Sequence, residues 1–326
     1  MCSSDLREIE QSITIGIEVN KNPFLLSGEG IDSILPAIAN TVLPSPYRDR
    51  DLISKKNYLG LFIEQELALS DRLSWEFEGT FDAAISDTSD LSELFVVEPI
   101  EDSNFYPELS INYQLSDRLL WFASLEYAAE PIGGSDVNNR QFKSEIYRGF
   151  ELGIETELNS NWWAIISFSK ETQNNITTND PDHPDFELQI NEQTSNSWTG
   201  EIIGEINSGW WLYGFYTYTD ATVTEDETIR VGDRVEGVAN HRAGLWSTYQ
   251  VSNGLGFGTG IVWNNERPGD AENSFTLPTY LQSDIAIFYS TNNLKAAISI
   301  QNLFNTGLED EEVEEQSYLG TVWLQL

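Results

Sequence analysis

Apolar and polar residues alternate along many short stretches of this chain. Leu255, Phe257 and Ile261, for example, alternate with glycines over residues 254–263. Successive side chains of a β-strand point to opposite faces, so this period of two predicts strands with one apolar and one polar or small face. The pattern predicts about fourteen antiparallel strands, at 10–20, 57–69, 72–86, 106–115, 118–129, 144–158, 162–175, 185–206, 209–223, 235–251, 254–266, 277–290, 294–305 and 316–326.

The connections between these segments alternate between short and long. Short turns recur at SDRLSW (70–75), SDRLLW (116–121), NSNWW (159–163), NSGWW (207–211), SNGLGF (252–257) and TNNLKA (291–296). Acidic stretches rich in Pro and Gly lie between them, at 82–105, 130–143, 172–185, 220–235, 265–276 and 305–316, and residues 21–56 read as one more long external loop. Tight turns on one side and long loops on the other are typical of outer-membrane β-barrels, whereas soluble sandwiches usually turn every 8–12 residues.

Alternation alone does not say which face meets lipid, and the tryptophans favour a membrane barrel. Six of the ten tryptophans fall within five residues after a short turn: Trp75, Trp121, Trp162, Trp163, Trp210 and Trp211. Tryptophan gathers at the headgroup level of a bilayer, so these residues predict an interfacial aromatic girdle. No run of about 18 apolar residues is present, which excludes transmembrane helices.

Composition narrows the class of partner. The chain has 53 acidic and 17 basic residues among 326, a formal charge of −36, which argues against a nucleic-acid partner. One cysteine excludes a disulfide framework, and the two histidines lie in no recognisable catalytic motif, so we expect neither an enzyme nor a resident cofactor. The first residues, MCSSDLREIEQS, contain no basic head followed by an apolar segment, so we expect no secretory signal in this chain.

From about residue 140 onward, the sequence resembles the C-terminal barrel portion of TonB-dependent siderophore receptors. The resemblance is carried by YRGFELGIETEL (147–158), NHRAGLWSTYQ (240–250), GLGFGTGIVWNNERPGD (254–270), LPTYLQSDIAIFY (277–289), IQNLFN (300–305) and the closing strand GTVWLQL (320–326). It implies part of an outer-membrane barrel of about 22 strands. It also implies import of ferric chelates with energy passed from TonB.

The resemblance also sets expectations about what is missing. We expect residues 1–326 to form one barrel domain with no plug domain and no TonB box. With about fourteen strands, either the first strand pairs with the last or strands from another chain complete the sheet, because unpaired backbone groups in hydrocarbon cost several kcal/mol each. A small plug-free channel for polar solutes and a soluble all-β binding module or glycosidase are the alternatives.

Candidate binding residues are few. Phe105, Tyr106 and Phe186 are aromatic residues that we expect in external loops, where they could stack on a planar chelate. The metal candidates Asp180, Asp182, His183 and Asp185 have the oxygen-rich composition of a cation loop, although we expect an ordinary solvated acidic loop and no bound metal.

Glutamates recur on the polar faces of many predicted strands. They are Glu64, Glu66, Glu76, Glu78, Glu126, Glu151, Glu155, Glu157, Glu201 and Glu205. Their period of two fits a hydrated acidic wall better than a glycosidase pair, which needs two carboxylates across a cleft. Such a wall would pair with Arg and Lys of a plug, and the overall acidity favours a neutral or cationic ligand over an anionic one.

Overall fold

The computed structural model describes residues 11–20, 57–85, 103–183, 185–251, 254–291, 294–306 and 316–324. Within these ranges no helix is long and apolar enough to cross a membrane. The strands are β1 (Gln11–Asn20), β2 (Asn57–Ser70), β3 (Leu73–Ile85), β4 (Ser103–Ser116), β5 (Leu119–Glu130), β6 (Glu145–Asn159), β7 (Trp162–Asn179), β8 (Glu187–Asn207), β9 (Trp210–Glu225), β10 (His241–Gln250), β11 (Leu255–Asn264), β12 (Arg267–Pro268), β13 (Thr276–Leu277), β14 (Tyr280–Ser290), β15 (Leu294–Gln301) and β16 (Ser317–Leu324).

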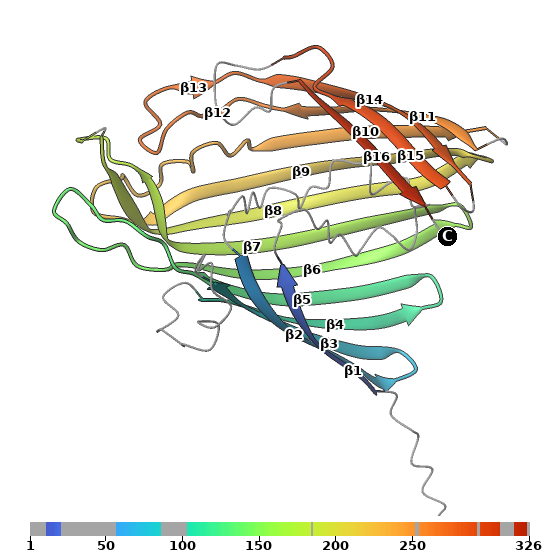
Figure 1. Cartoon of the computed structure of the whole chain (residues 1–326), viewed down its shortest axis with the longest axis horizontal. Helices are drawn as coiled ribbons and strands as arrows, with labels where there is room; N and C mark the ends of the chain where they lie inside the picture. The colour runs from blue at the N-terminus through green and yellow to red at the C-terminus, as the bar shows by residue number, and fades with distance from the viewer. Residues whose placement is uncertain are drawn as a thin grey trace, which may run out of the picture.

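Fourteen of these strands form one antiparallel sheet in which neighbours in sequence are neighbours in space. The order runs from β1 through β11 to β14, β15 and β16, while β12 and β13 form a separate small hairpin. The sheet curves into an open trough, with the short turns at one end of the strands and the long connections at the other (Figure 1). Strands β1 and β16 are its two edges and are not paired with each other in the described part of the chain. The predicted fourteen strands are confirmed, and the sheet is part of a barrel.

The short turns form where small polar side chains bond the backbone. The hydroxyl oxygen of Ser70 accepts a hydrogen bond from the N–H of Leu73 at 3.1 Å, and the Asn159 side chain accepts one from the N–H of Asn161 at 2.9 Å. Gly209 and Gly254 have φ of 81° and 90°, which glycine adopts at little cost. The Ser, Asn and Gly residues that predicted the short turns from the sequence therefore do stabilise them in the structure.

Several predicted boundaries differ from the structure by three or more residues, and two of them have a clear local reason. Strand β10 begins at His241 rather than at residue 235, because the preceding residues fold into an ordered external loop. Strand β15 ends at Gln301 rather than at residue 305. There Asn302, at φ 48°, donates its N–H to the buried Asp284 carboxylate at 2.8 Å, which turns the chain out of the sheet.

From β11 to β15 the apolar face of the sheet is exposed and the opposite face, with small and polar residues, is buried. On β11 the alternation is complete: Phe257, Ile261 and Trp263 are exposed, while the glycines between them are buried. On β15, Ile298 is 67% exposed beside the buried Ser299. A water-soluble protein would show the opposite. The predicted orientation is confirmed, and the soluble all-β alternative is wrong.

Two bands of exposed aromatic side chains border this apolar face. Beside the short turns, Trp210, Tyr249 and Phe257 are exposed cross-strand neighbours. Nearer the long loops, Trp198 and Tyr218 are exposed cross-strand neighbours in a second row. The eight residue steps from Trp210 to Tyr218 span about 26 Å along the strand, or about 20 Å of membrane height at the usual barrel tilt.

The predicted tryptophan girdle is only partly correct. Trp210 faces outward as predicted, but Trp163 and Trp211 pack against an inner cluster. That cluster contains the buried side chains of Ile203, Tyr213, Trp246 and Ala286. The consecutive pairs at 162–163 and 210–211 must divide between the two faces, because neighbouring residues of a strand point in opposite directions.

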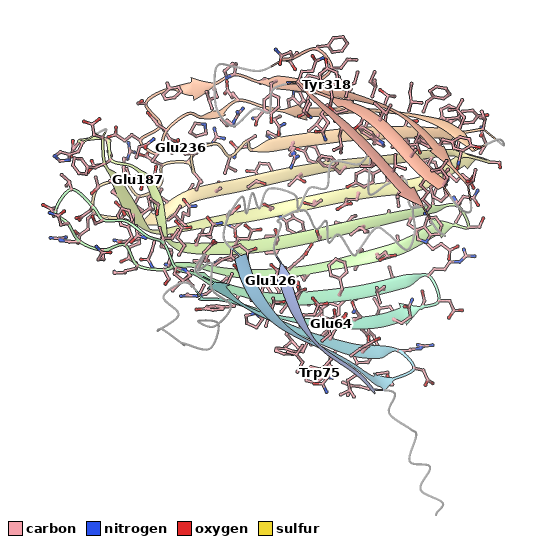
Figure 2. All side chains as sticks on the ribbon, viewed as in Figure 1. Glu64, Trp75, Glu126, Glu187, Glu236 and Tyr318 are labelled. Atoms are coloured by element: carbon pink, nitrogen blue, oxygen red, sulfur yellow. The ribbon has the colours of Figure 1, made fainter. Side chains whose placement is uncertain are left out.

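The inner face changes character across the sheet. From β2 to β5, Glu64, Glu78, Glu108 and Glu126 are successive cross-strand partners, so four carboxylates follow one another across four strands. We call these four residues the glutamate row; Figure 2 labels its ends, Glu64 and Glu126. The row lies on the face opposite the exposed apolar side chains, as the predicted acidic wall requires.

From β9 to β14 the inner face instead places large aromatic rings over glycines. Cross-strand partners are Phe215 and Gly244, Trp246 and Gly260, and Phe288 and Gly256. A Cβ built on Gly260 would lie 1.5 Å from Cε3 of Trp246, so the indole ring lies directly against the neighbouring strand. Only glycine permits this approach.

Candidate ligand-binding site

The β7–β8 hairpin extends well beyond the length needed to cross a bilayer. Strand β7 has 18 residues and β8 has 21, whereas crossing takes about 9–11 residues. The aromatic band places the membrane boundary near Trp198, so the strand pairs from there to the tip of the hairpin stand outside. Their ends lie among the long connections at the left of Figure 1.

A change of register re-aims the side chains of this outer part. The pairing of β8 with β9 is irregular between Glu192 and Gln193, where β9 has one extra residue, and nearby Asn175 on β7 has φ 61°. Below this point the buried side chains of β8 are odd-numbered, such as Gln193, whereas above it they are Leu188 and Ile190. A β-bulge re-aims side chains because the strands bend and their local twist increases at that point.

Two external loops fold over the re-aimed side chains. Residues 226–240 and 265–276 are joined by a reciprocal pair of bonds: the N–H of Arg234 donates to the Asn273 side-chain oxygen at 2.9 Å, and the Asn273 amide donates to the Arg234 carbonyl at 2.8 Å. Beneath them, the buried apolar residues Leu188, Ile190, Val223, Ile229 and Ala271 form a small core. The outer rim is therefore a packed structure.

A cavity of about 380 Å³ opens beside this core; we call it the rim cavity. It is lined by Ile176, Thr177, Thr178, Asn179, Glu187, Ile190, Gln193, Val223, Arg234, Val235, Glu236 and Ala271. Figure 2 shows the two carboxylates, Glu187 and Glu236, at the long-loop end of the sheet. Such a volume falls within the range of small-molecule sites, about 300–1,000 Å³.

The polar lining of the rim cavity is rich in hydrogen-bond acceptors. The Glu236 carboxylate accepts a bond from the Thr178 hydroxyl at 3.2 Å. The Thr177 hydroxyl is buried and has no hydrogen-bond partner among the residues described. The one cationic lining residue, Arg234, donates from Nη2 to the carbonyl of Val238 at 3.1 Å, so its guanidinium is engaged by its own loop.

The structure does not bring the three predicted aromatic ligand residues together. Phe105 and Tyr106 lie within strand β4, not in an external loop, because the strand begins at Ser103. Phe186 does lie in the loop between β7 and β8, where its side chain is 45% exposed. A stacking role for these residues stays a prediction.

The acidic metal candidates form a hydrogen-bonded turn. The buried Asp180 carboxylate accepts the N–H groups of Asp182 and His183, at 2.9 and 3.1 Å, and lies 3.2 Å from His183 Nδ1. Asp182 and Asp185 are exposed. In the ranges that the structure describes, no three His, Cys, Asp or Glu residues are grouped so that they could hold a metal ion.

Sequence reasoning missed the residues that line the rim cavity. Glu187 and Glu236 are about fifty positions apart, and nothing in their local context pairs them. The one usable signal was the Asn174-Asn175 pair within a predicted strand, because asparagine adopts left-handed backbone conformations more readily than most residues.

Residues 17–303 match the family model described as "TonB dependent receptor-like, beta-barrel". Among curated proteins, the chain is 28% identical to the metal-pseudopaline receptor CntO of Pseudomonas aeruginosa (strain UCBPP-PA14) over 67% of its own length and 31% of that receptor. It is 24% identical to the ferrichrome outer membrane transporter/phage receptor of Escherichia coli (strain K12), over 80% of this chain and 35% of that protein. The chain thus spans about a third of the length of the curated relatives it matches.

Solved structures show the same fold. The ferric yersiniabactin uptake receptor FyuA from Yersinia pestis superposes with a TM-score of 0.54 at 14% identity, covering 82% of this chain and 43% of that one. The ferric preacinetobactin receptor BauA from Acinetobacter baumannii gives a TM-score of 0.53 at 17% identity, with coverages of 82% and 42%.

Proposed function

We propose that this chain, which belongs to the TonB-dependent receptor-like β-barrel family, forms part of an outer-membrane receptor that takes up ferric siderophore-type chelates with energy passed from TonB. Members of this family are receptors and transporters of the outer membrane. The chelate, the TonB partner and the energised step are the proposal, since the chain spans only part of its relatives.

The observation that carries the proposal is the reversed burial of the sheet. Exposed Ile, Leu, Phe and Trp side chains on one face suit hydrocarbon, and the two aromatic bands suit the two headgroup levels. The opposite face carries glutamates, serines and glycines, which suit a hydrated interior. A chain built in this way passes or holds a polar cargo.

Iron chelates are the favoured cargo because of what the relatives bind by name. They include a metal-pseudopaline receptor, a ferrichrome transporter and a ferric-pyoverdine receptor. The packed outer rim with its cavity gives a place outside the membrane where a chelate could first be held. The plug-free channel is less well supported, since it requires β1 to pair with β16 and these edges are apart in the described sheet.

Membrane residence and chelate binding can be tested together. The full chain, expressed in a Gram-negative host, should fractionate with the outer membrane and shift its gel mobility on heating. A panel of ferric hydroxamates and catecholates should include one that quenches tryptophan fluorescence at micromolar concentration or below, while the iron-free chelators serve as controls. Uptake of labelled iron should require a host with intact TonB. Recovery of the chain in the soluble fraction would contradict the proposal, and so would a panel in which no ferric chelate binds.

A further inference from the structure

We infer that the rim cavity binds a protonated alkylamine, so that the preferred ligand carries a free primary ammonium group on an alkyl stem. The inference deepens the proposed function, on which it rests, by naming a chemical class for one part of the ligand. It is carried by the charge, the hydrogen-bonding character and the shape of the lining.

Charge is the first argument. Two carboxylates, Glu187 and Glu236, line the rim cavity against one guanidinium, that of Arg234. Arg234 already donates to the Val238 carbonyl. The Glu187 carboxylate, in contrast, makes no hydrogen bond or ion pair with any residue that the structure describes. An entering cation therefore meets a site with excess negative charge.

Hydrogen bonding is the second argument. An ammonium group has three donors and no acceptor. The lining offers carboxylate oxygens on Glu187 and Glu236, a buried Thr177 hydroxyl that lacks a partner among the described residues, and the Asn179 side chain. An anionic group such as a free carboxylate or phosphate would face two like charges.

Shape and polarity are the third argument. One side of the rim cavity is apolar, with Ile190, Val223 and Ala271 each less than a tenth exposed. A hydrated metal ion gains nothing from such a wall, whereas an alkyl stem buries surface at about 25 cal/mol per Å². The pairing of an acidic and an apolar wall fits an amine on a short hydrocarbon chain.

The direct test uses n-pentylammonium as the probe and the full chain in detergent micelles at pH 7, with binding followed by saturation-transfer difference NMR. We expect saturable binding in the low millimolar range and at least tenfold weaker binding of n-pentanol, which has the same chain without the charge. Glu187→Gln and Glu236→Gln should each weaken pentylammonium binding about tenfold. The matched control is Glu266→Gln, an exposed external-loop glutamate that does not line the cavity, and it should leave binding unchanged.

A second variant tests whether the probe binds inside the rim cavity, by filling the cavity without changing its charge. Val235→Phe places a larger side chain in the cavity and should abolish binding while every carboxylate is kept. Heat-dependent gel mobility confirms that each variant is folded. Pentanol binding as strong as pentylammonium binding would overturn the inference, as would no binding at all or binding unchanged in both Gln variants. These outcomes are independent of the chelate panel, so the inference and the proposed function can fail separately.

Discussion

The two halves of the sheet share one outer face but have different inner faces. Strands β2 to β5 carry the glutamate row, four like charges that are direct cross-strand neighbours. Strands β9 to β14 carry rings pressed onto glycines, and the one inner carboxylate on β14, that of Asp284, is buried and accepts the N–H of Asn302. The second inner face is held by packing of rings on glycines, whereas the first sets like charges directly opposite one another, an arrangement that is unfavourable in itself. The first half is therefore where a change of charge on the inner face should alter stability most.

The largest expected effect is the loss of stability when arginine is placed on the outer face. It tests whether the outer faces of the two halves of the sheet both meet lipid, although their inner faces differ. Leu125→Arg on β5 and Leu245→Arg on β10 replace exposed apolar side chains, 54% and 46% accessible. Both substitutions should cost about 2–4 kcal/mol, because a charge at mid-membrane depth is poorly solvated. The measurement is urea unfolding of the chain in lipid vesicles.

A substitution on the inner face controls for arginine itself. Ser110 lies on the acidic side of β4, and its hydroxyl donates to Glu108 at 3.1 Å. Ser110→Arg should change stability by less than about 1 kcal/mol, since the new cation lies among carboxylates. If this variant lost as much stability as Leu125→Arg, the assignment of the two faces in the first half would be wrong.

The next effect concerns the packing of aromatic rings on glycines in strands β9 to β14. Gly260→Ala would place its Cβ 1.5 Å from Trp246 Cε3 and force the indole away from β11. We expect a loss of about 2 kcal/mol from overpacking, together with a shift in tryptophan fluorescence. Gly200→Ala is the matched control, because a Cβ on that β8 residue meets nothing within 4 Å. Equal stability of the two variants would mean that the Trp246 ring is not held against the sheet.

A smaller effect tests repulsion in the glutamate row. Glu108→Gln removes one of the four charges while keeping an acceptor for Ser110. The variant should gain about 0.5 kcal/mol at low salt, and the gain should shrink at 1 M salt because the charges are then screened. Glu266→Gln, outside the row, should show neither change. A loss of stability in Glu108→Gln would indicate that the row is already neutralised within this chain.

The smallest effect concerns the external loop between β5 and β6. The Asp136 carboxylate accepts the N–H of Arg140 at 2.8 Å and that of Asn138 at 2.8 Å, and the Arg140 bond is the main reason that the pKa of Asp136 is lowered. The stabilisation of this turn is therefore present above the pKa of the unfolded chain and is lost as the pH falls through the lower folded value. Carboxyl NMR of Asp136 should titrate at lower pH than that of the same carboxyl in the urea-unfolded chain. Coincident titrations would rule out the bonded turn.

The membrane part of the fold follows from local chemistry and could be predicted almost completely. Alternation marked the strands, and Ser, Asn and Gly marked the turns, since both signals act within a few residues. Strand β15 was overextended because its end depends on Asp284, seventeen residues before Gln301. The first long loop, 21–56, lies outside the described residues.

The outer rim could not be predicted, because it depends on contacts between loops. The bonds between Arg234 and Asn273 join two loops separated by a whole hairpin. Phe105 and Tyr106 were singled out as aromatics near a loop, yet β4 includes both. The sequence identified these aromatic residues by their chemical type. Whether each lies in a strand or in a loop depends on the strand pairing, which the sequence does not show.

The irregularity near Asn175 and Gln193 divides the long β7–β8 hairpin into two stretches that are under different selection. Substitutions on the membrane side of it are constrained by insertion and by the fit to neighbouring strands. Substitutions beyond it alter the lining of the rim cavity and leave the membrane-spanning strands intact. The shape and charge of the rim cavity can therefore change during evolution without the barrel wall being rebuilt.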